Sequence, residues 1–336
     1  MRTSGFRGKH LLTWEAWDSD SIATVLTYAH ELKRCWATND INNVLAGQTI
    51  QFLSYQEAWG FEHLLTLAAS QLGAHVASVP AAMLQHEFSK NAHDIGLVLS
   101  RLGDSLVCCH DQFGIGHETL SAISEHATVP VIGGMSDQYA PVQAMADLMM
   151  IREIYGSQLK GLKLALVWVY GNNASRALGI PHSLLQLVTR MGVDVSLANP
   201  PEFPLLRSVV HQAKNHCQLS GGKVKRCETM EEALEGAQII YPVHWGGCAH
   251  IENYTGDETQ LQILKAHNER YTAWKLDQNR VCLSDFDARV LHPLPFERDR
   301  GVDSEVLDGP SSKVIDQAEN RLHVLKAVLA LTMAGR

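Results

Sequence analysis

The 336-residue chain has no apolar run long enough to cross a lipid bilayer. Residues 1–5 lack the apolar core of a signal peptide. Seven cysteines are present without a Cys-x-x-Cys pair, and an odd number of scattered cysteines is typical of reduced thiols in a cytosol. We therefore expect a cytoplasmic protein that does not associate with a membrane.

Signals for metals and nucleic acids are missing as well. The 17 histidines show no spacing that matches a zinc site, so the sequence predicts no metal and no cofactor. The net charge is −8 and basic residues are scattered, which disfavours a nucleic-acid surface but leaves room for a local cationic pocket. The expected partner is therefore a small-molecule substrate.

The chain is long enough for two domains, and apolar strand patterns alternate with helical patterns in both halves. Such alternation indicates an α/β fold with parallel sheets covered on both faces, that is, two doubly wound domains. The predicted strands cover residues 48–53, 76–79, 106–110, 129–133, 164–169, 193–197, 238–242 and a segment around 290. The predicted helices cover 22–32, 62–72, 94–102, 118–126, 144–155, 182–191, 209–220, 230–234, 258–266 and 317–334. We expect domains at 1–155 and 156–316, with 317–336 as a C-terminal helix that crosses back to the first domain.

Two runs near the end of the chain stand out. The segment 291–295 (Leu-His-Pro-Leu-Pro) is a tight loop whose prolines fix φ and leave carbonyls with few local donors, so these can face a ligand. The segment 316–323 (Asp-Gln-Ala-Glu-Asn-Arg-Leu-His) opens a long amphipathic helix. We expect Glu319, Asn320 and Arg321 in its first turn, near the positive end of the helix dipole.

These two runs together resemble the C-terminal signature of the aspartate/ornithine carbamoyltransferase family. Within the family the chain looks closest to the knotted branch that includes N-acetylornithine carbamoyltransferase, and segment 298–310 resembles that branch too. The resemblance implies the two-domain carbamoyltransferase fold, a knotted chain crossing and a homotrimer with sites near subunit interfaces. It places the active site at the C-terminal strand ends between the domains.

The half of the site that binds the amino-acid acceptor in the family has a counterpart here. Segment 241–247 (Tyr-Pro-Val-His-Trp-Gly-Gly) resembles the family's acceptor motif, which makes His244, Trp245 and Gly246 candidate substrate contacts. His244 is either a general base or a polar loop residue. Trp245 is either a substrate contact or a domain-interface anchor. By the same resemblance, His292, Leu294 and Arg321 hold the carbamoyl group.

The half that binds carbamoyl phosphate departs from the family. Its Ser-x-Arg-Thr-Arg run falls on 58–62 (Ala-Trp-Gly-Phe-Glu), and an Arg of a later strand falls on Cys109. Its His-Pro-x-Gln run falls on 140–143, where Ala140 replaces the His while Gln143 is kept. No register shift restores the first run, because the chain has no Arg or Lys between Arg34 and Lys90. A charge-assisted hydrogen bond contributes roughly 1.5–3 kcal/mol, so losing three Arg contacts weakens dianion binding by several decades.

Several residues remain candidates for this degenerate donor site. Trp59 and Phe61 suggest an apolar, aromatic-lined pocket, or else they are core or interface aromatics. The remaining cations that could approach are Lys90, Arg298, Arg300 and Arg321, each of which is otherwise a solvated surface charge. In the family, the loop that contains Lys90 reaches into a neighbouring subunit's site.

Three functions are compatible with these residues, because a fold does not specify its chemistry. The first is transfer of a carbamoyl or related group to an amine of an amino-acid-like acceptor from an atypical donor, with His292, Gln143 and Arg321 as catalytic residues. The second is a divergent enzyme of specialised metabolism that does not use carbamoyl phosphate. The third is a non-catalytic relative that binds a ligand. We favour the first as the family assignment and leave open whether the chain is an enzyme.

Overall fold

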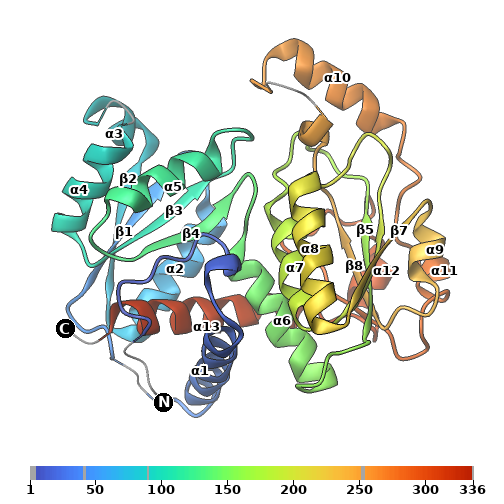
Figure 1. The fold of residues 1–336 in the computed structure, drawn as a ribbon, viewed down its shortest axis with the longest axis horizontal. Coiled ribbons are helices and arrows are strands. Elements are labelled where there is room, and N and C mark those ends of the chain that lie inside the picture. Colours follow the sequence, from blue (N-terminus) through green and yellow to red (C-terminus); the bar gives the residue numbers. More distant parts are fainter. Residues whose placement is uncertain (1–4, 41–42, 89–90, 251–253, 335–336) are drawn as a thin grey trace. The chain divides into compact units, whose positions relative to one another are not determined.

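The computed structural model describes residues 5–40, 43–88, 91–250 and 254–334. The chain forms two compact units (Figure 1). Unit 1 comprises Met1–Ala146 and Glu319–Arg336, and unit 2 comprises Asp147–Ala318. The last part of the C-terminal helix thus belongs with the first unit. Among the described residues, no helix has the length and apolar character needed to cross a membrane.

Unit 1 is built on a parallel sheet with the strand order β2-β1-β3-β4. Its elements are η1 (Trp14–Ala16), α1 (Ser19–Ala37), β1 (Thr49–Ser54), α2 (Trp59–Leu72), β2 (His75–Pro80), α3 (Ala81–His86), α4 (Ala92–Leu102), β3 (Ser105–His110), α5 (Gly116–His126), β4 (Val131–Ser136) and the start of α6 (Pro141–Tyr155), whose remainder belongs to unit 2. Asp18 caps α1 by accepting a hydrogen bond from the Ser21 amide. The two faces of the sheet are separated by strand alternation, since Leu53 and Cys108 pack toward α4 and α5 while Phe52 stacks on Phe61 of α2.

Unit 2 is built on a parallel sheet with the strand order β7-β6-β5-β8-β9. Its elements are β5 (Lys163–Trp168), α7 (Gly179–Arg190), β6 (Asp194–Ala198), α8 (Arg207–Ser220), β7 (Lys223–Cys227), α9 (Met230–Leu234), β8 (Ile239–Val243), η2 (Gly247–His250), α10 (Glu258–Glu269), α11 (Gln278–Val281), β9 (Arg289–Val290), α12 (Ser304–Asp308) and the start of α13 (Val314–Met333). The strand order reverses between β5 and β8, and in doubly wound sheets ligands bind at such a point.

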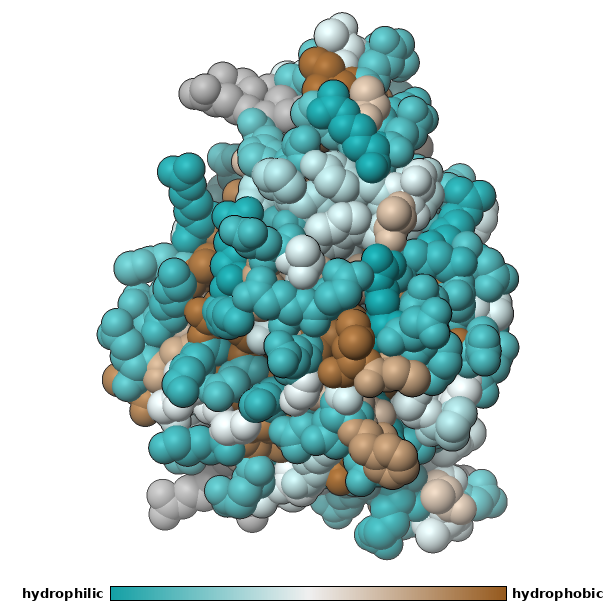
Figure 2. Space-filling view, turned by 90° about the vertical axis from the view of Figure 1, so that its right-hand side faces the viewer, coloured by the Kyte–Doolittle hydropathy of each residue, from teal (hydrophilic) through white to brown (hydrophobic). Residues whose placement is uncertain are grey.

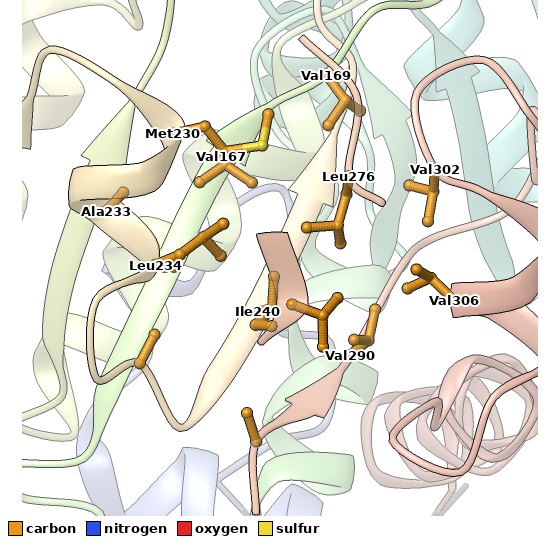
Figure 3. Close-up of a cluster of buried hydrophobic side chains, with 14 of the residues drawn as sticks. Val167, Val169, Met230, Ala233, Leu234, Ile240, Leu276, Val290, Val302 and Val306 are labelled. Atoms are coloured by element: carbon orange, nitrogen blue, oxygen red, sulfur yellow. The ribbon is translucent and has the colours of Figure 1, made fainter. Parts of the chain in front are cut away.

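The core of unit 2 has one large apolar cluster on the sheet face that α9, α11 and α12 cover (Figures 1 and 3). Val167 on β5, Ile240 on β8 and Val306 on α12 point toward one another in this cluster (Figure 3). Figure 2 looks onto the side on which α9 and α11 lie in Figure 1. The hydrophobic residues visible there form small separate groups among hydrophilic ones, so the apolar surface of these elements is turned inward.

The two predicted α/β domains with parallel sheets are confirmed, but some elements differ from the sequence-based prediction. Helix α13 begins at Val314, so Glu319, Asn320 and Arg321 lie beyond its first turn, and the prediction that they lie in that turn is wrong. The helix starts early because the preceding chain is bonded to β9, with the Lys313 amide donating to the Val290 carbonyl. Strand β7 was not predicted because it is a polar edge strand with mostly exposed residues.

We predict that Ile240→Ala lowers the free energy of unfolding by about 2–5 kcal/mol, because Ile240 is fully buried in the cluster and its truncation leaves a cavity. Leu219→Ala on α8 is the matched control. Leu219 is 90% exposed, so its loss should change stability by no more than about 0.5 kcal/mol. Urea unfolding followed by circular dichroism measures both. Equal effects of the two substitutions would contradict the assigned core.

Candidate functional site

The predicted proline loop lies directly after β9 in unit 2 and holds His292 in a buried position. The His292 amide donates to Gln317 Oε1 at 2.8 Å, and its Nδ1 lies 2.7 Å from the Pro242 carbonyl oxygen. A carbonyl can only accept, so Nδ1 carries the proton and Nε2 presents a lone pair. Burial lowers the pKa of His292 to about 4, so the ring is neutral at physiological pH.

A buried carboxylate, Asp147 of α6, organises the surroundings of this loop within unit 2. Its Oδ2 accepts from the Tyr241 hydroxyl of β8 at 2.8 Å, and its Oδ1 accepts from the Gln317 side-chain amide at 2.6 Å. Gln317 in turn accepts a hydrogen bond from the backbone amide of His292. A chain of hydrogen bonds therefore fixes where His292 lies. The sequence analysis did not single out Asp147, although it is the one charged residue within the apolar stretch 144–151 of α6.

His244 follows β8, and both of its ring nitrogens face backbone carbonyls. Nδ1 lies 2.9 Å from the Val169 oxygen and Nε2 lies 2.8 Å from the Asn173 oxygen. Gly171 approaches the ring so closely that a Cβ there would lie 2.6 Å from the imidazole. Burial lowers the pKa of His244 although both carbonyls act in the opposite direction. With both nitrogens occupied, His244 holds the loop after β5 in place and is not open to take a substrate proton.

Trp245 and Gly246 are also packed into the unit rather than presented to a ligand. Trp245 is fully buried, and its indole donates to the Phe203 carbonyl at 2.8 Å. The Trp245 carbonyl accepts from the indole of Trp168. A Cβ on Gly246 would lie 2.6 Å from the Ala174 carbonyl oxygen, so only glycine permits this approach of two loops. These residues determine the shape of the loop.

Arg176 and Glu297, which sequence analysis did not single out, link the two loops in front of His292. The Arg176 guanidinium lies 3.3 Å from Glu297 Oε1, and Glu297 Oε2 accepts from the Asn172 amide at 2.9 Å. A cavity of only about 10 Å³ remains between these residues, His244 and His292. Such a volume holds about one water molecule, so a substrate must displace part of this link.

The other predicted residues of unit 2 lie further out. Leu294 is 45% exposed, and its peptide bond to Pro295 is cis. Arg298 forms a bidentate pair with Asp308, with distances of 2.7 and 2.8 Å, on an exposed surface. Arg300 donates to the side chain of Asn172. Both arginines are therefore engaged by protein groups.

The predicted donor residues of unit 1 separate into a core residue and a surface residue. Phe61 is 8% exposed and stacks on Phe52 with ring centroids 6.2 Å apart, so it is a core aromatic. Trp59, at the start of α2, is 71% exposed. Helix α2 begins at Ala58 without a side-chain cap, and the acidic Glu62 lies in its first turn. A negative charge there opposes binding of an anion at the helix N-terminus.

A cavity of about 430 Å³ lies beside Trp59, at the carboxyl ends of β1 and β2. Its lining includes two carboxylates, Glu57 and Glu62, and among its described lining residues there is no Lys or Arg. Glu62 accepts a hydrogen bond from the Ser78 hydroxyl across the cavity. The cavity is thus electronegative, the opposite of what a phosphate dianion requires.

Three more predicted residues lie in unit 1, or at the helix that leads out of it. Cys109, at the end of β3, is fully buried, which raises the pKa of its thiol to about 12, while the nearby charge of Arg321 acts in the opposite direction. Gln143 is buried on α6. Lys90 lies outside the described residues. Within the described part of the chain, no group of His, Cys, Asp and Glu side chains is arranged to hold a metal ion.

Comparison with known proteins agrees with this fold. The family description "Aspartate/ornithine carbamoyltransferase, carbamoyl-P binding domain" matches residues 9–153, and "Aspartate/ornithine carbamoyltransferase, Asp/Orn binding domain" matches residues 160–332. The chain belongs to the aspartate/ornithine carbamoyltransferase family. It is 31% identical over 322 residues to ornithine carbamoyltransferase of Bacillus subtilis (strain 168), covering 96% of this chain and 93% of that protein.

Solved structures give the same result. The ornithine carbamoyltransferase of Pyrococcus furiosus superposes with a TM-score of 0.86 at 30% identity, covering 98% of this chain and 99% of that one. An N-acetyl-L-ornithine transcarbamylase superposes with a TM-score of 0.84 at 25% identity, covering 96% and 99%. The chain therefore has the architecture of both branches, and its placement nearer the knotted branch stays a prediction.

The low pKa of His292 makes stability depend on pH. The unfolded chain takes up a proton at this residue near its ordinary pKa of 6.5 and the folded chain only near 4, so stability falls as the pH drops through this window. The loss is about 3 kcal/mol for this residue. We expect His292→Asn, which keeps a donor for Pro242, to shift the midpoint of acid unfolding to lower pH, whereas substitution of the exposed His75 by Asn should not. Unchanged midpoints in both variants would contradict the buried neutral state.

Removing the Asp147 carboxylate should destabilise unit 2 strongly. Asp147→Ala leaves the Tyr241 hydroxyl and the Gln317 amide buried without their acceptor, at a cost of about 1–3 kcal/mol each. Asp147→Asn should cost half of this or less, because one amide oxygen still accepts from Gln317. Chemical denaturation gives both values. Equal losses for the two variants would mean that packing, and not hydrogen bonding, determines the role of this side chain.

Proposed function

We propose that this family member transfers a carbamoyl or related acyl group to an amine of an amino-acid-like acceptor, from a donor that carries no phosphate dianion. The observation that carries this proposal is the cavity at the ends of β1 and β2, whose described lining has two carboxylates and no Lys or Arg. A related N-acetyl-L-ornithine transcarbamylase has been solved with carbamyl phosphate and N-succinyl-L-norvaline bound. In this chain the residues aligned with the family's phosphate ligands cannot supply the charge that such a donor needs.

Electrostatic magnitudes support an uncharged donor. Each missing Arg contact removes roughly 1.5–3 kcal/mol of binding free energy. Each unit of like charge at 4 Å adds a repulsion of about 1 kcal/mol in water, and more where water is excluded. Glu57 and Glu62 both line the cavity, so a dianion loses attraction and gains repulsion at the same place. A neutral donor, such as an amide or ester of carbamic acid, avoids both penalties.

The acceptor side has the charges that an amino acid requires. Arg176 and Glu297 pair with each other in front of His292. A zwitterionic amino acid can exchange this pair for two new ones, its carboxylate binding Arg176 and its ammonium binding Glu297. This exchange conserves charge pairing, so opening the 10 Å³ cavity does not leave a buried charge alone.

His292 is the proposed centre of the chemistry. Its Nε2 lone pair can accept a hydrogen bond from the amino group of a carbamoyl moiety, and the carbonyls around the Leu294 turn can do the same. An amine of the acceptor in its neutral form attacks the carbonyl carbon. The new C–N bond forms as the bond to the leaving group breaks, and the leaving group takes the proton that the amine loses. Gln143 remains a proposed contact of the carbamoyl group, and Arg321 remains the proposed cation that assists an anion. A homotrimer is also proposed from the family resemblance, and a cytoplasmic location from the scattered cysteines.

A second candidate is a non-catalytic ligand-binding protein. It is favoured by the occupied nitrogens of His244 and by the narrow cavity beside His292, since both leave little open space around the reactive histidine. Binding of an amino acid without turnover of any carbamoyl donor would support this candidate. Turnover of a phosphate-free donor would support the first one.

Calorimetric titration with carbamoyl phosphate tests the proposal. The wild-type chain should show no binding at millimolar concentration and no phosphate release. The triple variant Ala58→Ser/Gly60→Arg/Glu62→Arg restores the family's charges and leaves the core residue Phe61 in place. A Cβ on Gly60 meets no neighbouring atom within 4 Å, so the arginine can be accommodated. Each new guanidinium should tighten binding roughly 10- to 100-fold.

The matched control is Ala58→Ser/Gly60→Gln/Glu62→Gln, which removes the Glu62 charge at the same positions without adding a cation. It should bind far more weakly than the arginine variant. Micromolar binding of carbamoyl phosphate by the wild-type chain would overturn the proposal, because other cations would then have replaced the missing arginines.

A further inference from the structure

A cavity of about 920 Å³ in unit 2 lies away from the His292 loop, between the first half of α8 and strands β6 and β7. Its volume falls within the range typical of small-molecule sites, about 300–1,000 Å³. Apolar side chains form part of its wall, among them Leu197, Leu206 and Val224. The cavity therefore offers an apolar surface large enough for a small organic molecule.

The charged residues of this cavity are all basic. Arg207, Lys214 and Arg226 line it, together with His211 and His250, and the described lining residues include no Asp or Glu. None of the three permanent cations forms an ion pair within the described part of the chain. All three side chains are exposed, so an anion in the cavity adds ion pairs that the described part of the chain does not supply.

Nearby groups of the opposite sign are engaged elsewhere. Glu202, on the loop that borders the cavity, accepts from the Tyr271 hydroxyl and pairs with Arg270 at 3.6 Å, and it does not line the cavity. Helix α8 begins at Leu206 with no side-chain cap and no acidic residue in its first turn. The positive end of this helix therefore adds to the field of the side-chain cations.

One polar side chain offers a further contact. Asn199, which is 5% exposed, lines the cavity, and its amide nitrogen donates to the Pro200 carbonyl at 2.8 Å. Its Oδ1 accepts no hydrogen bond from the described residues. A ligand in the cavity that carries a hydroxyl or amino group can donate to this oxygen.

We propose that this cavity is a binding site for a phosphorylated small molecule with an apolar ring body and a free hydroxyl or amino group, the class that nucleoside phosphates represent. The phosphates lie against Arg207, Lys214 and Arg226, the ring lies on the apolar wall, and the donor group reaches Asn199 Oδ1. This inference does not depend on the proposed transferase activity, because it involves none of the donor or acceptor residues.

The site shares a segment with the acceptor loop, which gives a ligand there a way to influence it. The loop that borders the cavity presents the Phe203 carbonyl to the indole of Trp245. On the other side, His250 of η2 lines the cavity and contacts the Pro201 carbonyl. A bound ligand therefore contacts the two segments next to the Trp245 loop, namely the loop before α8 and η2.

Equilibrium titration of the full chain with ATP at low ionic strength tests the proposal, with adenosine and tripolyphosphate as partial ligands. We expect saturable binding of ATP in the micromolar range. Lys214→Glu/Arg226→Glu should weaken it about 100-fold, since each lost charge-assisted contact corresponds to roughly tenfold. Lys223→Glu/Lys265→Glu, with the same change of charge at exposed positions outside the cavity, is the matched control and should bind ATP within about threefold of wild type.

Three other results would contradict the proposal. Equal weakening by the control would show that only net charge matters and would overturn the site. Tripolyphosphate binding as tightly as ATP would overturn the role of the ring body and of Asn199. Absence of saturable ATP binding at millimolar concentration would overturn the proposal altogether. Thermal melts of all variants check folding, and Lys214→Gln/Arg226→Gln, which introduces no repulsion, replaces the Glu pair if that pair does not fold.

Discussion

One buried carboxylate, that of Asp147, determines the position of the loop that holds His292 in unit 2. Asp147 accepts hydrogen bonds from the Tyr241 hydroxyl and from the side-chain amide of Gln317. Gln317 in turn accepts a hydrogen bond from the backbone amide of His292. A buried charge is tolerated only when it is fully hydrogen-bonded, so these partners cannot move independently. Asp147 and Gln317 lie on α6 and α13, the two helices in which the division between the units falls. The same interaction therefore positions the proline loop and anchors both helices to the sheet.

Charge is distributed in this chain in a way that its family membership alone would not suggest. The cavity at the ends of β1 and β2 has Glu57 and Glu62 in its described lining. The cavity beside β6, β7 and α8 has Arg207, Lys214 and Arg226. A fold supplies strand ends and helix N-termini in both places, but the side chains decide the sign of the field. The chain thus has the architecture of its family, but the cations line the cavity beside α8 and not the cavity at the ends of β1 and β2.

On the acceptor side, residues whose type suggests a contact with substrate make contacts with the protein itself. His244, Trp245 and Gly246 occur together in a motif, and their sequence suggested substrate contacts. In the folded unit each one satisfies backbone groups of neighbouring loops, through the Val169, Asn173 and Phe203 carbonyls and through the close approach of Ala174. Arg176 and Glu297, separated by more than a hundred residues in the chain, line the small cavity beside His292 instead. No local pattern marks such a pair.

The sequence by itself was sufficient for the fold class and the family, because strand and helix periodicity and the His-Pro-Leu-Pro run are local properties of the chain. It also showed that the chain has no Arg or Lys between Arg34 and Lys90, which is the basis for the proposal of an atypical donor. Only the tertiary structure decided that Phe61 is a core residue while Trp59 is exposed, that Arg298 is paired with Asp308, and that three distant cations share one cavity. Burial and charge pairing depend on which segments meet in space, and that information is absent from any single stretch of sequence.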